Sequence, residues 1–410
     1  MSGALTPAQA LQLFLNSLPP DTRVGVAVSG GGDSMALLHM LAHAPCMVCA
    51  CSVHHHLRPE ADAEVASVAA FCAAHDIAHE VVDWHWDGQG NLQDQARRGR
   101  YALLSDWATR NDLAHVALGH TADDNIETLL MGLSRGAGLD GLSGMRPWFI
   151  GSGVTFHRPL LAIRRAALRD LLRQAGVAWH DDPSNDDPSY HRIRLRQAMD
   201  SFEGLGLTPD MLLKTIGNLR ATREGLETAL AQSARGHVRA IHGDLRIDRG
   251  WFDAAPIEYR RRILNACLCD IASRDYPPRA AKLTPLLSTP PAVSTLHGCL
   301  VMADPAALHV TREHSATESP VVSTGLWDGR WRANGPHQDG TILRALGEDG
   351  IAQCPAGWRD LALPRASVLA SPSVWDGPNL LSAPMANWPN GWVISASSPP
   401  PAALASILSH

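Results

Sequence analysis

The stretch SGGGDS at residues 29–34 decides the fold of this chain. It follows Val24, Val26 and Val28, an apolar run that predicts a buried strand, and it precedes residues 35–41, whose composition predicts a helix. A strand, a glycine-rich turn and a helix together bind phosphate, because backbone N–H groups can approach the anion and the helix N-terminus adds its dipole. The candidate nucleotide ligands are therefore Ser29, Gly30, Gly31, Gly32, Asp33 and Ser34.

The residues around this loop exclude the two commoner phosphate-binding motifs. The chain has only two lysines, Lys214 and Lys282, so the Walker A lysine is missing. The dinucleotide fingerprint requires a third glycine where Met35 stands. The pattern S-G-G-x-D-S is instead that of the PP-loop of the ATP pyrophosphatase superfamily, whose members cleave ATP between the α and β phosphates. ATP is therefore the expected substrate.

The first half of the chain alternates predicted strands and helices, which indicates an α/β fold with a parallel sheet covered on both faces. Because strands end at a common edge in such a sheet, the polar residues that follow three of them should converge on one ligand site. These clusters are SGGGDS, residues 54–58 and residues 119–124. The predicted strands cover residues 23–28, 47–53, 78–84 and 114–119, and the predicted helices cover 7–17, 34–43, 60–75, 92–111 and 124–135.

The length of 410 residues predicts two or three domains. We expect a catalytic PP-loop domain at 1–200, a helical region at 201–284 that would bind a partner or serve as a linker, and a small β-rich domain at 285–410, where proline, glycine and tryptophan increase. Within the first two regions, helices are predicted at 164–175, 190–201 and 208–235. The four glycines in residues 136–144 predict a loop without a stable element, which would serve as a lid or as a linker.

The composition places bounds on location and partners. No run of about 18 apolar residues is present, so no membrane span is expected. The N-terminal segment lacks a secretory pattern, and the eight cysteines are therefore expected to be reduced in the cytoplasm. The net charge of −6 argues mildly against a nucleic-acid partner, but local arginine runs are sufficient for phosphate contacts. Such runs lie at 97–100, 158–173 and 192–196.

Two carboxylates are the candidate magnesium ligands. Asp33 lies in the phosphate loop, and Asp124 starts the helix that follows the fourth strand, where it should face that loop. Oxygen ligands suit Mg²⁺, which neutralises a triphosphate. Acidic residues in a first helical turn can also serve only to complement the helix dipole, so this alternative remains open for Asp124.

The histidines and cysteines have less specific interpretations. His54, His55 and His56 follow a strand, where consecutive side chains point in opposite directions, so all three cannot bind one zinc ion. Contact with nucleotide or substrate is the favoured role. Cys49 and Cys51 lie on a predicted interior strand, where cysteine acts as a small apolar residue.

Several segments follow one another in a fixed order: SGGGDS, VHHHLR at 53–58, ARRGRY at 96–101, GHTADDNIETLLMGLSRGAG at 119–138, the run GLSGM ending at Met145, RPLL at 158–161, DPSN at 182–185 and YHRIRLR at 190–196. Together they resemble the tRNA(Ile)-lysidine synthase family over about residues 20–200. His54 and His56 stand where many members of that family have aspartate and glycine.

The resemblance implies a ligase that modifies the wobble cytidine of the isoleucine tRNA with a CAU anticodon. ATP adenylylates the C2 oxygen of the cytosine and releases pyrophosphate, and the ε-amine of free lysine then displaces AMP to form lysidine. The loop amides, Mg²⁺ on Asp33 and Asp124, and the Arg135 guanidinium are expected to stabilise charge. The expected substrate contacts are His55, Arg58, Arg97, Arg100 and Glu127, and the expected tRNA contacts are Arg192, Arg194 and Arg196.

Other functions remain open at this stage. The main alternative is a PP-loop tRNA thiolation enzyme, which would use cysteines near the nucleotide. A catalytically silent tRNA-binding protein would have lost the aspartate or serine of the loop, and both are present. A small-molecule PP-loop synthetase would not need the arginine-rich middle region. A homodimer is possible.

Overall fold

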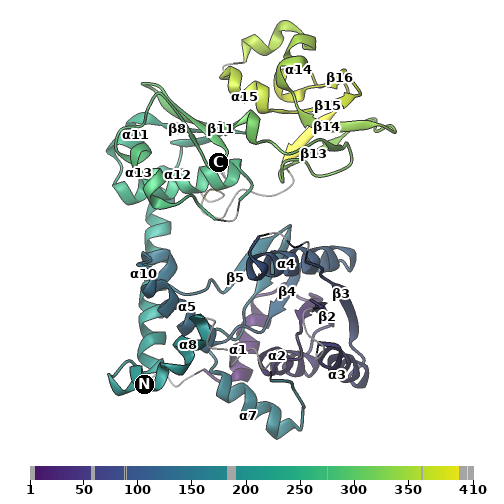
Figure 1. The fold of residues 1–410 in the computed structure, drawn as a ribbon, viewed down its shortest axis with the longest axis vertical. Helices are drawn as coiled ribbons and strands as arrows, with labels where there is room; N and C mark the ends of the chain where they lie inside the picture. Colours follow the sequence, from purple (N-terminus) through teal and green to yellow (C-terminus); the bar gives the residue numbers. More distant parts are fainter. Residues whose placement is uncertain are drawn as a thin grey trace. The chain divides into compact units, whose positions relative to one another are not determined.

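The computed structural model describes residues 5–56, 61–86, 88, 90–181, 191–274, 276–361, 363–396 and 404, without the side chains of 191–193 and 200. The chain divides into two compact units, Met1–Glu224 and Gly225–His410 (Figure 1). In the described residues, no helix is long and apolar enough to cross a membrane.

The first unit is built on a six-stranded sheet with the order β3-β2-β1-β4-β6-β5. The strands are β1 (Val24–Ala27), β2 (Val48–His54), β3 (Ala78–Asp83), β4 (His115–Leu118), β5 (Trp148–Gly151) and β6 (Val154–His157). The pairs β1–β2, β2–β3, β1–β4 and β4–β6 are parallel, and only β5 pairs antiparallel, with β6. The four predicted strands and the parallel sheet are confirmed.

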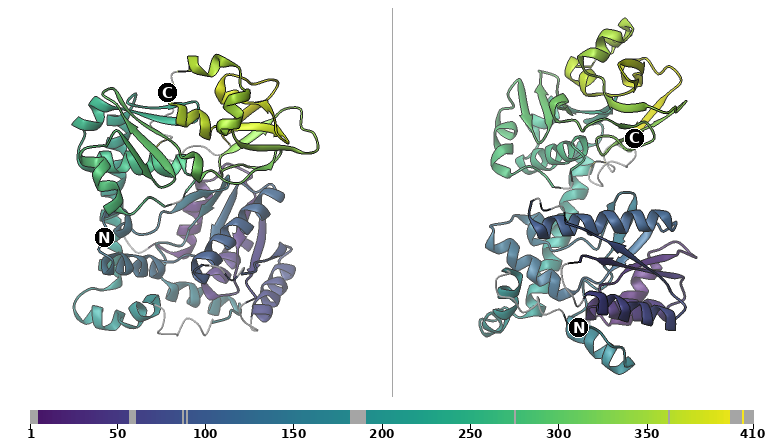
Figure 2. Two further views of the ribbon diagram at one scale, coloured as in Figure 1. Left: turned by 45° about the horizontal axis from the view of Figure 1, so that its top comes forward. Right: turned by 45° about the vertical axis from the view of Figure 1, so that its right-hand side comes forward.

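Helices cover both faces of this sheet, as predicted (Figures 1 and 2). One core joins the sheet to α1, α2, α3 and α7, and a second joins the other face to α4, whose Trp107 is fully buried. Apolar residues of α1, α2, α3, α4 and α7 pack against the sheet, and this burial is the main favourable contribution to the folding free energy. The helices are α1 (Pro7–Asn16), α2 (Gly32–Ala42), α3 (Ala61–Ala74), α4 (Leu92–Arg110), α5 (Ala122–Ser134) and α7 (Arg165–Ala175).

A third apolar cluster in this unit joins α5 to the helices that follow α7. Ile126, Leu129 and Leu130 of α5 pack against Leu212 and Ile216 of α10. The later helices are α8 (His191–Gln197), α9 (Met199–Gly204) and α10 (Pro209–Ala234), close to the predicted ranges. Helix α10 also supplies Leu230 and Ala234 to a core of the second unit.

The expectation that residues 136–144 form no stable element is wrong. Residues Leu139–Leu142 form the short helix α6, and the Ser143 hydroxyl, fully buried, donates to the Leu139 carbonyl. The loop is held from outside, because Asn125 Oδ1 accepts the Met145 N–H at 2.8 Å. Gly144 has φ of +69°, and a Cβ there would lie 2.3 Å from Asn125 Oδ1. Tertiary contacts thus order a segment whose composition predicts a loop.

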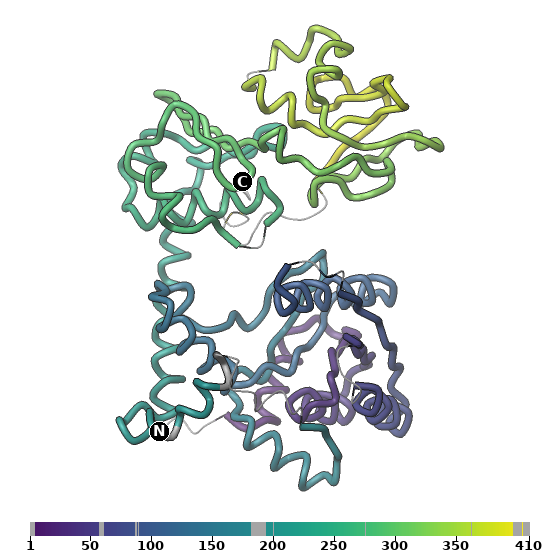
Figure 3. The backbone as a smooth tube through the Cα atoms, viewed as in Figure 1, coloured from purple at the N-terminus to yellow at the C-terminus, as the bar shows by residue number. Residues whose placement is uncertain are grey.

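The second unit contains two groups of sheets, and Figure 3 follows its backbone path. The first is a five-stranded antiparallel sheet, β7-β8-β11-β10-β9, which packs on α11, α12 and α13. Its elements are β7 (Val238–Ile241), β8 (Asp244–Asp248), α11 (Arg249–Ala254), α12 (Ile257–Ile271), α13 (Ala280–Ser288), β9 (Val293–Leu296), β10 (Cys299–Ala303) and β11 (Ala307–Arg312).

The second group consists of a four-stranded sheet, β12-β14-β15-β16, and the pair β13–β17. Trp327, Trp375 and Trp392 are buried in its two small cores. The elements are η2 (His314–Ala316), β12 (Val321–Val322), β13 (Trp331–Asn334), β14 (Thr341–Ala345), α14 (Gly347–Gln353), η3 (Ala356–Asp360), α15 (Arg365–Ala370), β15 (Pro372–Asp376), β16 (Asn379–Ser382), η4 (Pro384–Ala386) and β17 (Val393–Ala396).

The β-rich C-terminal part is confirmed, but strands begin earlier than expected. The hairpin β7–β8 lies inside residues 201–284, which sequence patterns predict to be helical. Leu245 and Ile247 alternate with polar residues and are buried in the core. This alternation marks a strand, but it covers only a few residues between two helices and is easily missed in the sequence. The domain boundaries at 200 and 284 remain predictions.

Candidate active site at the carboxyl edge of the sheet

The SGGGDS loop presents the N-terminus of α2 at the end of β1. Gly31 is the N-cap residue, and no side chain caps the helix, so the first-turn N–H groups keep their capacity for an anion. Gly30 has φ of +82°, and a Cβ there would lie 3.0 Å from Glu64 Cβ. A side chain at this position would strain the turn and press on α3. The local backbone therefore requires glycine where the phosphates are expected.

The two serines of the loop hold its shape. Ser34 Oγ accepts the Ser29 N–H at 3.2 Å and donates to the Gly31 carbonyl at 2.9 Å. The hydroxyl oxygens of Ser29 and Ser34 lie 3.2 Å apart. Ser34 is buried, so its hydroxyl closes the turn from within.

Arg165 joins the two candidate metal ligands. Its Nε donates to Asp33 Oδ2 at 2.7 Å, and its Nη2 donates to Asp124 Oδ1 at 3.2 Å. The two carboxylates come from α2 and α5, so the structure brings together Asp33 and Asp124 as expected. It adds a cation between them that sequence patterns did not indicate.

Helix caps position this cluster. Asp124 Oδ2 accepts the N–H and the hydroxyl of Thr121, both at 2.8 Å, in the capping box that begins α5. The neighbouring Asp123 accepts the backbone N–H of Arg165 at 2.7 Å and the Arg164 guanidinium at 3.2 Å. Asp123 thus accepts a backbone N–H that has no partner within α7, and it fixes the position at which this helix begins.

Glu127 extends the cluster by one turn of α5. Its Oε1 accepts Nε and Nη2 of Arg196 at 2.9 and 2.8 Å, and Nη1 of Arg165 lies 3.9 Å away. A cavity of about 230 Å³ opens beside it. This cavity has both acidic and basic walls, lined by Asp123, Ile126, Glu127, Leu130, Arg164, Arg165, Leu195, Arg196, Met199, Glu203 and Pro209.

The electrostatics of the cluster leave room for a further cation. Burial raises the pKa of Asp33 above its ordinary value, and this effect outweighs the opposing charge of Arg165. Burial would lower the pKa of Arg165, but Asp124 and Asp33 raise it, so the guanidinium stays charged. Asp33 Oδ1 is buried and has no hydrogen-bond partner in the described part of the chain. A buried carboxylate oxygen beside a second carboxylate fits Mg²⁺, which prefers such ligands.

The structure does not bring Arg135 to this site. Arg135 is exposed at the C-terminal cap of α5, eleven residues after Asp124. At about 1.5 Å per residue, this separates the two residues by about 16 Å along the helix. The guanidinium that accompanies Asp33 and Asp124 is that of Arg165, which replaces Arg135 in our interpretation.

The other predicted contact residues lie in several places. Arg97 and Arg100 do not contact Glu127 but lie over the Tyr101 ring, and together with Arg158 they lower the Tyr101 pKa. The guanidiniums that lie against Glu127 are those of Arg196 and Arg165. His55 packs edge-on against Trp84. Arg194 is exposed on α8. Arg58, the DPSN segment and the side chain of Arg192 lie outside the described residues.

Sequence patterns did not single out Arg165. It is the second residue of the predicted helix 164–175 and the first residue of α7, where a positive charge opposes the helix dipole. That unfavourable position is the one local signal for a carboxylate partner. The pairing itself spans 132 residues along the chain between Asp33 and Arg165, so no local pattern reports it.

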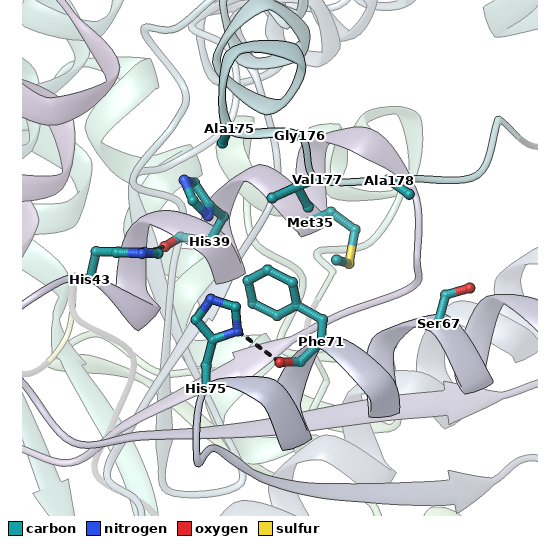
Figure 4. Close-up of a pocket in the computed structure, with 10 residues that line it drawn as sticks. All are labelled: Met35, His39, His43, Ser67, Phe71, His75, Ala175, Gly176, Val177 and Ala178. Carbon is teal, nitrogen blue, oxygen red and sulfur yellow. Dashed lines mark hydrogen bonds between the residues drawn. The ribbon is translucent and has the colours of Figure 1, made fainter.

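A larger cavity of about 400 Å³ lies between α2, α3 and the end of α7 (Figure 4). It is lined by Met35, Phe71 and the imidazoles of His39, His43 and His75. Burial lowers the pKa of His39 below its ordinary value, which favours the neutral form of this imidazole. None of the residues of the Asp33–Arg165 cluster lines this cavity.

The chain is similar to curated proteins along nearly its whole length. Residues 5–201 match the PP-loop domain family. The tRNA(Ile)-lysidine synthase of Ruegeria pomeroyi is 44% identical over 402 residues, which cover 96% of each chain. That of Hyphomonas neptunium is 39% identical over 68% of this chain and 78% of its own. Among solved structures, the U34-tRNA thiolase NcsA of Methanococcus maripaludis, with its [4Fe-4S] cluster, matches with a TM-score of 0.44 and 17% identity over 52% of this chain and 76% of that one.

Proposed function

Because this chain belongs to the tRNA(Ile)-lysidine synthase family, we propose that it ligates free lysine to C2 of the wobble cytidine in CAU-anticodon tRNA(Ile). The chain is a ligase-type enzyme with an ATP-using PP-loop domain, and tRNA modification follows from its family. The observation that carries the finer proposal is the carboxylate–guanidinium cluster beside the uncapped start of α2.

The first step is adenylylation of the cytosine. The C2 carbonyl oxygen attacks the α-phosphate of ATP, and pyrophosphate leaves. Because this oxygen is amide-like, the step depends on positioning and charge stabilisation more than on a strong base. The α2 N-terminus supplies backbone donors, and Arg165 supplies a fixed positive charge within reach of Asp33 and Asp124. Asp33 and Asp124 would hold Mg²⁺, which neutralises the phosphates when bound.

The second step uses free lysine as the nucleophile. Its ε-amine attacks C2, loses a proton and displaces AMP. The cavity next to Glu127 has the wall chemistry that an amino acid requires, with carboxylates for ammonium groups and guanidiniums for a carboxylate. Arg196 and Arg164 therefore replace Arg97 and Arg100 as our candidates for the lysine carboxylate, and Glu127 and Glu203 are the candidates for its amines.

The placement of the cysteines favours this proposal over tRNA thiolation. All eight cysteines are free, and Cys49, Cys51 and Cys72 are buried in apolar cores. Burial raises the pKa of Cys51 to about 12 and that of Cys72 to about 11, so neither is a thiolate at neutral pH. Sulfur transfer and cluster ligation both require accessible thiolates near the nucleotide.

The test is incubation with ATP, Mg²⁺, radiolabelled lysine and a CAU-anticodon tRNA(Ile) transcript. We expect label in this transcript and none in tRNA(Met), with one AMP formed per lysine incorporated. No label, or equal label in both tRNAs, would overturn the proposal. Sulfur incorporation from a labelled donor would support the thiolation alternative instead. Location in the cytoplasm and a homodimer remain predictions, for which cell fractionation and analytical ultracentrifugation are the measurements.

A further inference from the structure

A group of metal-ligating side chains lies at the ends of β2 and β3, outside the cluster around Arg165. His54 is the last residue of β2, His56 follows two residues later, and Asp83 ends β3. One ligand atom from each of these three residues lies within 4.8 Å of the others. No other such group of histidine, cysteine or carboxylate side chains occurs in the described parts of the chain.

The backbone explains how two of the three histidines come together. His56 adopts φ of +52°, a left-handed conformation, directly after the strand. Its ring lies 4.0 Å from that of His54 and stacks on His85, while His55 points to Trp84. Because successive side chains point in opposite directions, His55 is separated from the group, as expected. His54 and His56 remain together on the same side of the chain. The neighbouring strand then adds a carboxylate that the histidine run does not reveal.

The neighbours of the two rings show what an ion would replace. His54 Nδ1 accepts the backbone N–H of His56 at 3.2 Å, and an ion on this nitrogen would replace that hydrogen bond. His54 Nε2 is buried and lies 3.1 Å from Asp62 Oδ1, an ion-pair distance without a hydrogen bond. A carboxylate beside the second nitrogen of a ligating histidine can orient its ring. His56 Nε2 and Asp83 Oδ1 are hydrogen-bonded at 2.7 Å, and an ion held by both atoms would replace the proton between them.

We propose that His54, His56 and Asp83 bind one divalent transition-metal ion, with Zn²⁺ as the best-fitting ion and Asp62 as the residue that orients His54. Two imidazoles and one carboxylate suit zinc, and three protein ligands leave a fourth position for water. His54 is buried, while His56 and Asp83 are exposed, so the ion has an open side. Magnesium is disfavoured, because it prefers oxygen ligands.

The ion would tie the segment that leaves β2 to the end of β3. The PP-loop follows β1, which pairs with β2, so this site shares the sheet edge with the nucleotide site but uses different residues. The proposal does not depend on the lysine ligation reaction, and its tests need no tRNA or ATP.

Metal binding is measured directly on the full, untagged chain after chelator treatment. We expect calorimetric titration with ZnCl₂ in excess MgCl₂ to give one tight site. Co²⁺ in place of Zn²⁺ should give visible d–d bands of a four-coordinate site. His56→Ala and Asp83→Asn should each weaken Zn²⁺ binding at least about tenfold and remove the bands, and Asp62→Asn should weaken binding about tenfold or more.

The matched control is His43→Ala, an exposed histidine in the three-histidine cavity on α2. It should leave both the affinity and the spectrum unchanged. Absence of a one-to-one site, binding that Mg²⁺ abolishes, or equal losses in the control would overturn the proposal. Asp83→Asn keeps the side-chain shape, and its circular dichroism and melting temperature separate lost binding from lost folding.

Discussion

Two arginine clusters in this protein have the same chemistry and different charge balance. In the first unit, three carboxylates lie against two guanidiniums, because Arg165 contacts Asp33, Asp124 and Glu127, and Arg196 also contacts Glu127. In the second unit, Arg312 forms a bidentate pair with Asp328, with Nε and Nη2 donating at 2.7 and 2.8 Å.

Four of the five N–H groups of Arg312 have acceptors, because Nη1 and Nη2 also donate to the carbonyls of Gly298 and Ala316. The Arg165 cluster instead keeps a buried carboxylate oxygen, Asp33 Oδ1, without a partner in the described residues, and a cavity opens beside the cluster. A balanced pair is suited to holding the fold, whereas an excess of negative charge next to a cavity is suited to receiving a cation or a substrate.

The largest expected effect is the loss of stability on breaking the Arg312–Asp328 pair. Arg312→Met leaves Asp328, which is 3% exposed, without its counter-ion. We expect the free energy of unfolding to fall by about 3–5 kcal/mol, as is typical when one partner of a buried pair is removed. Urea denaturation followed by tryptophan fluorescence measures it, since Trp327 lies in this region. The double variant Arg312→Met/Asp328→Leu should recover most of the loss, and a single-variant loss below about 1 kcal/mol would contradict the structural role.

The next effect is on chemistry instead of stability. Asp33→Asn removes a charge whose burial already raises its pKa, so the fold should tolerate the change. We expect ATP–pyrophosphate exchange to fall about 10²–10³-fold, the usual effect of removing one charge-stabilising group. Filter binding of tRNA should stay within about twofold of wild type, since Asp33 is paired with Arg165 inside the site and is not one of the proposed tRNA contacts. A joint loss of exchange, tRNA binding and melting temperature would place Asp33 with Arg312 as a structural residue.

The contrast also explains what the sequence could predict. The strands, the helices of the first unit and the conformation at SGGGDS follow from local patterns of burial and turn chemistry, and Asp33 and Asp124 follow from the shared edge of a parallel sheet. The ion pairs of Arg165 and Arg312 join residues far apart or buried in irregular segments, so no period in the sequence reports them. Helix α6 is ordered by Asn125 and Ser143 against its composition.

Asp244 sharpens the comparison, because it is a half-buried carboxylate of the second unit whose pKa is raised. Burial raises its pKa to about 6, while nearby Ser367, Thr311 and Arg330 oppose this shift. The folded state therefore binds a proton that the unfolded state has lost between about pH 4 and pH 6. The stability that this proton contributes is complete below pH 4 and is lost as the pH rises through 6.

The effect should amount to about 1–3 kcal/mol over that range. Urea denaturation of wild type and Asp244→Asn at several pH values between 4 and 7 measures it. The wild type should lose stability relative to the variant as the pH rises. Parallel curves for the two proteins would contradict the prediction and would show that Asp244 is ionised in the folded protein throughout this range.

The smallest effect separates two neighbouring arginines of α8. Arg196 donates to Glu127 in the cavity wall, and Arg194 is exposed on the surface of the same helix. If Arg194 contacts one tRNA phosphate, Arg194→Ala should lower tRNA affinity by up to about fivefold, the effect of an exposed ion pair. The slope of log affinity against log salt should fall by about one. Arg196→Ala should instead raise the KM for lysine, because it removes a proposed contact of the lysine carboxylate at the cavity wall, and should leave the salt slope unchanged. The same salt slope in both variants would mean that the division of α8 between substrate and tRNA is wrong.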